Sequence, residues 1–86
     1  MSISKPSQEQ LSKLIKYFQD RQFIDAEKLA ISITKEFPEH QFTWKVLGVV
    51  LIQVGRLNES LTATQKSIEL NPTDSEAHYN LGVILK

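Results

Sequence analysis

Cysteine is absent from the 86 residues. The chain therefore has neither disulfides nor thiolate metal ligands, and packing alone must stabilise a small core. An excess of charge of one sign is absent too, because ten basic and ten acidic side chains give a net charge of zero with both histidines neutral. Such a chain lacks the electrostatic field that attracts nucleic acids or anionic membranes, so we expect neither as a partner.

Long hydrophobic runs are also missing. The longest, from Val46 to Val54, is interrupted by Gly48 and Gln53, and it is far shorter than the roughly 18 residues that a membrane span requires. The first six residues contain no apolar stretch of the kind found in a secretory signal. Hydrophobic residues at 41% and charged residues at 23% are ordinary for a globular domain. We expect one small folded domain with a cytoplasmic location.

Apolar residues recur with the period of a helix in several segments. Ser7 and Gln10 fit a capping box. The apolar stripe that follows this box comprises Leu11, Leu14, Ile15 and Phe18. After polar residues at 20–22, a second stripe comprises Phe23, Ala26, Ala30, Ile33 and Phe37. Pro38 ends the second stripe, so the two predict a pair of amphipathic helices joined by a tight turn.

The segment 41–54 is compatible with two structures. Its valine, leucine and isoleucine residues suit a buried strand, because β-branched side chains favour sheets. Its length favours a helix, because about fourteen residues between Pro38 and Gly55 are too many for a typical strand. We expect a helix that is buried on most sides and ends at Gly55.

Two more helices are expected after Gly55. The apolar residues of the first are Leu57, Leu61, Ile68 and Leu70. Asn71 and Pro72 end it, and Thr73 or Asp74 is expected to cap a last helix that begins at Ser75. The whole chain is therefore predicted to contain five helices and no strand.

Residues recur at a spacing of thirty-four positions. Pro38 and Pro72 are separated by this distance, as are Gly48 and Gly82. Three aliphatic pairs have the same spacing: Leu47 with Leu81, Val49 with Val83, and Leu51 with Leu85. Such a recurrence across helix–turn–helix units is typical of tetratricopeptide repeats.

Short motifs strengthen this resemblance. The segment 44–48, Trp-Lys-Val-Leu-Gly, resembles the opening of a tetratricopeptide repeat, and the segment 77–82 resembles the same helix one repeat later. The segments 55–61 and 70–74 resemble the turn within a repeat and the connection between repeats. The resemblance implies an all-α fold in which antiparallel helical hairpins stack as a short right-handed solenoid.

The register of the motifs predicts the repeat boundaries. We expect an N-terminal extension at 1–6, a degenerate first repeat at 7–40, a second repeat at 41–74 and the first helix of a truncated third repeat at 75–86. Lys13 and Leu14 stand where the family has Leu-Gly, and terminal repeats are often atypical because one side meets water. At Gly48 and Gly82 we expect a neighbouring helix to cross so closely that a side chain would force the helices apart.

Residue patterns for catalysis or metal binding are missing. The sequence contains no glycine-rich phosphate loop, no H-E-x-x-H and no G-x-S-x-G. His40 and His78 have no close ligand spacing and no cysteine to complete a zinc site. We expect His40 to cap or flank a helix start, and His78 to occupy the motif position that Trp44 holds one repeat earlier. The chain is predicted not to be an enzyme and to need neither cofactor nor metal.

Stacked hairpins offer a concave surface, lined by the first helix of each pair, on which peptides bind. The resemblance therefore implies a non-catalytic protein–protein interaction or scaffold module. The residues expected to face a protein or peptide partner are Leu11, Ile15, Phe18, Phe42, Lys45, Val49, Ile52, Gln53, Tyr79 and Val83. Gln8 and Glu76 share their register. The alternative is that the aliphatic residues among them only pack against neighbouring helices.

Two specialised binding modes of the family match this sequence poorly. Chaperone-binding members clamp a C-terminal carboxylate with lysine, arginine and asparagine, for which Lys45 and Asn80 are the only candidates here. Asn80 also resembles the asparagine row of protein O-linked N-acetylglucosamine transferases, but Ser12 and Val46 occupy the equivalent positions. The sequence favours neither mode.

The C-terminal residues Val83, Ile84 and Leu85 are apolar and lack a following helix in this sequence. Either the chain is an excerpt of a longer array, or its last helix docks on another copy and forms a homo-oligomer through these three residues. Two alternatives to partner binding therefore stay open. One is self-association, and the other is a role as the N-terminal accessory region of a larger enzyme, such as a glycosyltransferase or methyltransferase.

Overall fold

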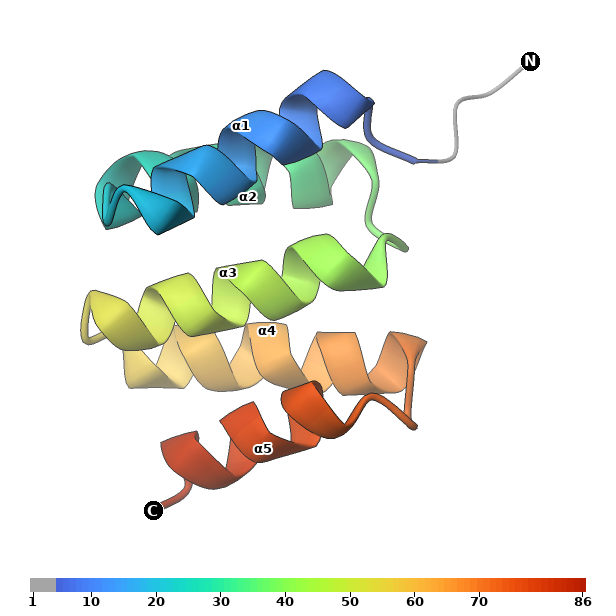
Figure 1. The fold of residues 1–86 in the computed structure, drawn as a ribbon. Helices are drawn as coiled ribbons and strands as arrows, with labels where there is room; N and C mark the ends of the chain where they lie inside the picture. Colours follow the sequence, from blue (N-terminus) through green and yellow to red (C-terminus); the bar gives the residue numbers. More distant parts are fainter. Residues whose placement is uncertain (1–4) are drawn as a thin grey trace.

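The computed structural model describes residues 5–86, which form five α-helices and no strand. The helices are α1 (Gln8–Gln19), α2 (Phe23–Glu36), α3 (Gln41–Gln53), α4 (Leu57–Leu70) and α5 (Ser75–Ile84). Each helix packs on the next one in the chain, and α1, α3 and α5 lie on one side of the stack with α2 and α4 behind them (Figure 1). The predicted all-α fold is confirmed. The expected extension at 1–6 lies mostly outside the described residues.

Side chains cap the first and last helices. The Ser7 hydroxyl accepts a hydrogen bond from the backbone N–H of Gln10 at 3.1 Å, and Gln10 Oε1 accepts one from the N–H of Ser7 at 2.9 Å. At α5, Asp74 Oδ1 accepts from the N–H groups of Glu76 at 3.0 Å and Ala77 at 3.4 Å. These bonds satisfy amides that have no partner within the helix. The predicted capping box and the cap by Asp74 are both confirmed.

The segment that could have been a strand is helix α3, which contacts α2, α4 and α5. Because neighbours surround it, its side chains are apolar on most sides, and Leu47, Val50 and Leu51 are buried. Residues from the first two helices and α4 complete the same core. They are Leu14, Ala26, Ala30, Ile33, Phe37 and Ala63.

The turns after α1 and after α3 have the same backbone geometry. Residues 20–22 and 54–56 donate three equivalent backbone hydrogen bonds, shifted by 34 positions. The central residue of each turn is left-handed, with φ of 59° at Arg21 and 81° at Gly55. Glycine adopts this conformation without strain, whereas a residue with a Cβ is destabilised by roughly 1–2 kcal/mol.

Side chains repeat the same spacing. Trp44 Nε1 donates to the carbonyl oxygen of Pro38 at 2.7 Å, and His78 Nε2 pairs with the carbonyl oxygen of Pro72 at 2.7 Å. A carbonyl only accepts, so this contact requires the His78 tautomer that carries its hydrogen on Nε2. His78 therefore occupies the position of Trp44, as expected. His40 precedes α3 without capping it, and its Nδ1 lies 2.8 Å from the Thr43 hydroxyl.

Helices α3 and α4 approach each other closely at Gly48. A Cβ at this position would lie 2.5 Å from Thr64 Oγ1, and the Ser60 hydroxyl donates to the carbonyl oxygen of Gly48 at 2.7 Å. The side of α4 that faces this contact is made of small residues. They are Ser60, Ala63, Thr64 and Ser67, all buried.

The expectation of a close crossing at Gly82 is wrong. At Gly82 nothing lies within 4 Å of the place that a Cβ would occupy, because no helix of the described residues crosses α5 there. Among the apolar residues of α4, Leu57 is exposed. The interface with α3 is built from small side chains instead, because the close approach at Gly48 leaves no room for larger ones.

Candidate functional site: a groove across α1, α3 and α5

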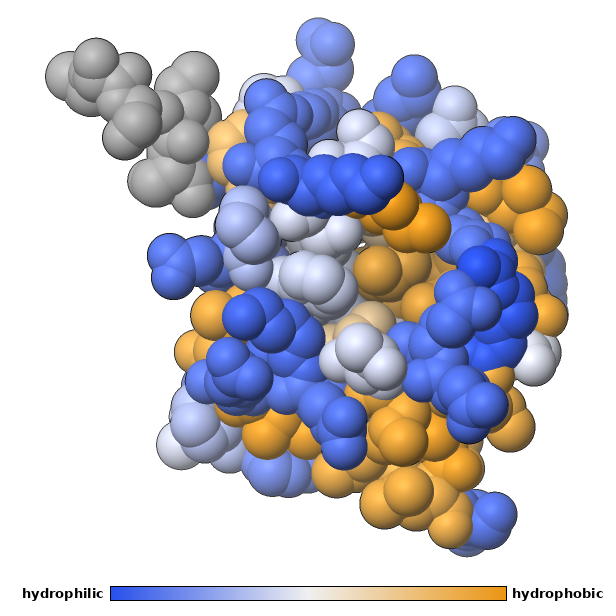
Figure 2. Space-filling model, turned by 180° about the vertical axis from the view of Figure 1, so that it is seen from behind, coloured by the Kyte–Doolittle hydropathy of each residue, from blue (hydrophilic) through white to orange (hydrophobic). Residues whose placement is uncertain are grey.

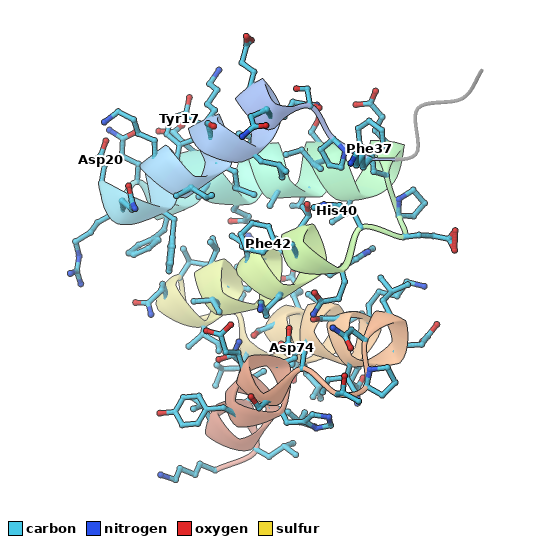
Figure 3. The ribbon with its side chains drawn as sticks, turned by 45° about the vertical axis from the view of Figure 1, so that its right-hand side comes forward. Tyr17, Asp20, Phe37, His40, Phe42 and Asp74 are labelled. Atoms are coloured by element: carbon cyan, nitrogen blue, oxygen red, sulfur yellow. The ribbon has the colours of Figure 1, made fainter. Side chains whose placement is uncertain are left out.

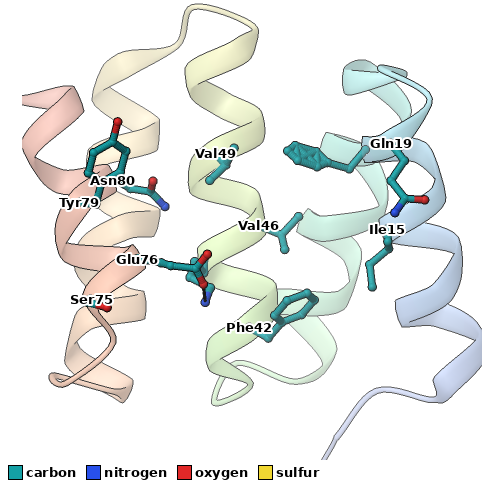
Figure 4. Close-up of a pocket in the computed structure, with 11 residues that line it drawn as sticks. Ile15, Gln19, Phe42, Val46, Val49, Ser75, Glu76, Tyr79 and Asn80 are labelled. Carbon is teal, nitrogen blue, oxygen red and sulfur yellow. Dashed lines mark hydrogen bonds and ion pairs between the residues drawn. The ribbon is translucent and has the colours of Figure 1, made fainter.

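An open groove with a volume of about 770 Å³ runs across the side of the stack formed by α1, α3 and α5 (Figure 4). It crosses the C-terminal half of α1 and the N-terminal parts of α3 and α5. Most of its lining side chains are apolar or aromatic. The lining residues are Ile15, Phe18, Gln19, Phe42, Lys45, Val46, Val49, Ser75, Glu76, Tyr79 and Asn80.

The groove brings together six of the ten residues predicted to face a partner. These are Ile15, Phe18, Phe42, Lys45, Val49 and Tyr79. The other four lie toward the ends of their helices, beyond the part that the groove crosses. They are Leu11, Ile52, Gln53 and Val83.

The prediction missed Gln19, Val46 and Ser75. Gln19 and Val46 follow directly after Phe18 and Lys45, which were predicted. A groove between two helices is lined by positions i+3 and i+4 of each helix, because both point to the same face. That rule would have identified Gln19 and Val46.

The two exposed large hydrophobic side chains of the groove are on the outer helices. Tyr79 on α5 keeps 73% of its surface exposed, and Ile15 on α1 keeps 39%. Val46 and Val49 of α3 lie between them in the floor, partly buried (Figure 4). The floor residues pack within the chain, whereas Ile15 and Tyr79 leave apolar surface exposed at the groove.

A polar cluster borders the groove where α3 faces the start of α5 (Figure 3). Lys45 Nζ lies 2.9 Å from Asp74 Oδ2 and 2.9 Å from Glu76 Oε1. Gln41 Nε2 donates to Asp74 Oδ2 and to the Ser67 hydroxyl, both at 2.8 Å. The cluster therefore joins α3 and α4 to the cap of α5.

The hydrogen bonds in this cluster fix its charge states. The bonds from Lys45 and then Gln41 lower the pKa of Asp74 to about 2. Burial opposes the charge on Lys45, but its bonds to Asp74 and Glu76 outweigh burial and raise its pKa. Asp74 and Lys45 are therefore both charged at neutral pH. The ammonium of Lys45 is thus already neutralised by two carboxylates of its own chain.

The comparisons with known proteins agree with this geometry. Residues 48–86 match the family model described as a TPR repeat. The chain contains tetratricopeptide repeats. A stretch of 60 residues, 70% of the chain, is 40% identical to the peroxisomal targeting signal receptor of Candida albicans, of whose length the chain spans about 10%. No solved structure matches the chain.

The tetratricopeptide repeats identify a protein–protein interaction module, because stacked repeats of this kind present an extended binding surface. No three histidine, aspartate or glutamate side chains within residues 5–86 are grouped as metal ligands. No helix among the same residues is both long and apolar enough to cross a membrane. The cytoplasmic location expected from the sequence stays a prediction.

A second ion-pair cluster holds the two hairpins of the tetratricopeptide array together, away from the groove. Arg56, the residue before α4, pairs through Nη1 with Glu27, which is buried on α2. Its Nη2 also lies 2.6 Å from Glu59 Oε2. Because a buried carboxylate without a partner is strongly destabilising, the pairing with Arg56 stabilises Glu27 and joins α2 to the turn before α4.

Proposed function

We propose that this chain binds a segment of a partner protein in the groove across α1, α3 and α5. The observation that carries the proposal is the pair of exposed hydrophobic side chains, Ile15 and Tyr79, on either side of an apolar floor. Large apolar side chains around an open groove are typical of a surface that a helix or an extended peptide covers. The groove, at about 770 Å³, has room for several side chains of such a segment.

The proposal includes three repeat units with the boundaries 7–40, 41–74 and 75–86. With these boundaries, the first helix of each unit lines the groove. The hydrogen bonds that recur at a spacing of 34 residues support this division. The Candida albicans relative is by its name a receptor for a targeting signal, which supports recognition of a segment of another protein.

Selection of peptides from a random library tests this proposal. Peptides selected on the wild-type chain should lose at least about tenfold in affinity for a chain with Ile15→Ala and Tyr79→Ala, since each buried anchor contributes about 1 kcal/mol or more. Ile24 and Leu57 are also exposed but lie outside the groove. A control chain with both changed to alanine should bind as the wild type does. Equal losses in the two double variants would contradict the proposal.

A second candidate function is assembly with another copy of the chain through α5. Leu85 keeps 66% of its surface exposed, Val83 is exposed as well, and no atom of residues 5–86 would lie within 4 Å of a Cβ at Gly82. Figure 2 shows hydrophobic residues gathered at the lower end of the molecule, where α5 lies. Two α5 helices could cross at Gly82, because glycine allows backbones to approach closely.

Light scattering behind a sizing column tests the assembly. A mass that rises above 9.8 kDa with concentration, and that falls back when Val83 and Leu85 are both changed to lysine, would support it. A constant monomer mass at all concentrations would exclude it.

A further inference from the structure

The charges at the groove are distributed unevenly. Lys45 is the basic residue and Glu76 the acidic residue of the groove lining, and Asp74 is bonded to Lys45 directly behind them. The Lys45 side chain is only 17% exposed and bonds to both carboxylates, whereas the Glu76 side chain is 80% exposed. The three groups together carry one net negative charge. A ligand in the groove therefore meets a carboxylate rather than a free ammonium.

A carboxylate on the ligand would be unfavourable at this place. Lys45 is mostly buried and already bonded to two carboxylates, and a ligand carboxylate beside it would add a third negative charge to the cluster. If the ligand carboxylate took the place of Asp74 at Lys45, it would also break one of the two hydrogen bonds that α3 donates to the cap of α5.

A basic side chain on the ligand would be favourable at the same place. It can pair with the exposed carboxylate of Glu76 without breaking the bond from Lys45 to Asp74. Tyr79 is three residues further along α5 and also faces the groove (Figure 4), so its exposed ring can contact the same cation.

We propose that the groove selects an apolar segment that carries a lysine or arginine beside its apolar face, and that it disfavours segments with a carboxylate there, including a free C-terminus. This inference rests on the proposed function, because it assumes that the groove is the binding site.

Three matched peptides test the inference by fluorescence anisotropy. Each is a labelled amphipathic helix of about four turns with a leucine face and blocked ends. They differ only at one position beside that face, which is lysine, glutamine or glutamate. The lysine peptide should bind about three- to fivefold more tightly than the glutamine peptide, as for a partly exposed ion pair. The glutamate peptide should bind more weakly than both. Salt at about 0.5 M should reduce these differences.

Two variants of the chain test whether the preference for the lysine peptide depends on Glu76. Glu76→Gln keeps an oxygen that accepts from Lys45 but removes the charge, so it should abolish the preference for lysine. Glu69→Gln is the matched control, because Glu69 is comparably exposed but lies on α4 outside the groove, and it should leave the preference unchanged.

The outcomes separate the two proposals. Binding that Tyr79→Ala weakens, but with equal affinities for the three peptides, would overturn the inference and leave the groove as the binding site. A lysine preference that survives Glu76→Gln would overturn it as well. If no peptide bound in a way that depends on Ile15 and Tyr79, the proposed function would fail and the inference with it.

Discussion

Replacing each of two equivalent glycines by alanine should change stability in opposite directions. Gly48 and Gly82 occupy the same motif position, 34 residues apart. A Cβ at position 48 would lie 2.5 Å from Thr64 Oγ1, whereas a Cβ at position 82 would have no neighbour within 4 Å. The same chemical change therefore enters a filled contact in one repeat and open space in the other.

The expected magnitudes follow from two competing terms. Alanine is favoured over glycine by about 1 kcal/mol inside a helix. Gly82 lies in the last turn of α5, so about half of this gain, near 0.5 kcal/mol, is expected there. At Gly48 the gain is opposed by overpacking, which costs about 1–3 kcal/mol in a well-packed interface. The net effect of Gly48→Ala should be a loss of about 1 kcal/mol.

Thermal unfolding followed by circular dichroism measures both changes. For a domain of this size, 1 kcal/mol corresponds to about 4–8 °C in Tm. Gly82→Ala should therefore raise Tm by a few degrees and Gly48→Ala should lower it by about 5 °C. Adding Thr64→Ala to Gly48→Ala removes the clashing atom and should reduce the loss caused by Gly48→Ala. Equal stabilisation by both glycine substitutions would refute the close contact between α3 and α4.

Three further substitutions test other parts of the structure. Arg21→Gly should raise the free energy of unfolding, measured by urea denaturation, by about 0.5–1 kcal/mol. The reason is that Arg21 has the same left-handed conformation as Gly55. A loss of stability would contradict the equivalence of the two turns. Thr64→Val should raise the free energy of unfolding by about 1 kcal/mol, because the buried Thr64 hydroxyl has no hydrogen-bond partner among residues 5–86. Destabilisation would mean that the hydroxyl has a partner. The pKa of Asp74 falls on folding from 3.8 to about 2, so its contribution to stability is complete above pH 3.8 and is lost as the pH falls through about 2. In a plot of Tm against pH, Asp74→Asn should reduce the fall in Tm below pH 3.8. An unchanged fall would refute the contribution of Asp74 to stability.

The sequence predicts the helices well because their signals are local. The capping box of Ser7 and Gln10 sets the start of α1, and Gly55 marks the turn after α3. Length decided between helix and strand at 41–54, where β-branched residues favoured the wrong structure. The left-handed conformation of Arg21 has no such local signal, because arginine rarely adopts it, and it becomes evident only from the equivalence with Gly55.

The groove could be predicted only in part, because its shape depends on how separate helices meet. The register placed Ile15, Val49 and Tyr79 on one side of the stack, and all three line the groove. The pairing of Lys45 with Asp74 could not be predicted, since it joins residues 29 positions apart through tertiary contact. The register therefore identified Lys45 as a groove residue but did not show that its charge is neutralised.

The measurement that tests the central claim most directly is an NMR titration of the isotope-labelled chain with a peptide selected from the library. The account predicts that amide signals of residues along the groove shift and saturate together, above all those around Ile15, Val49 and Tyr79. Saturable shifts confined to the opposite side of the stack, on α2 and α4, would contradict it.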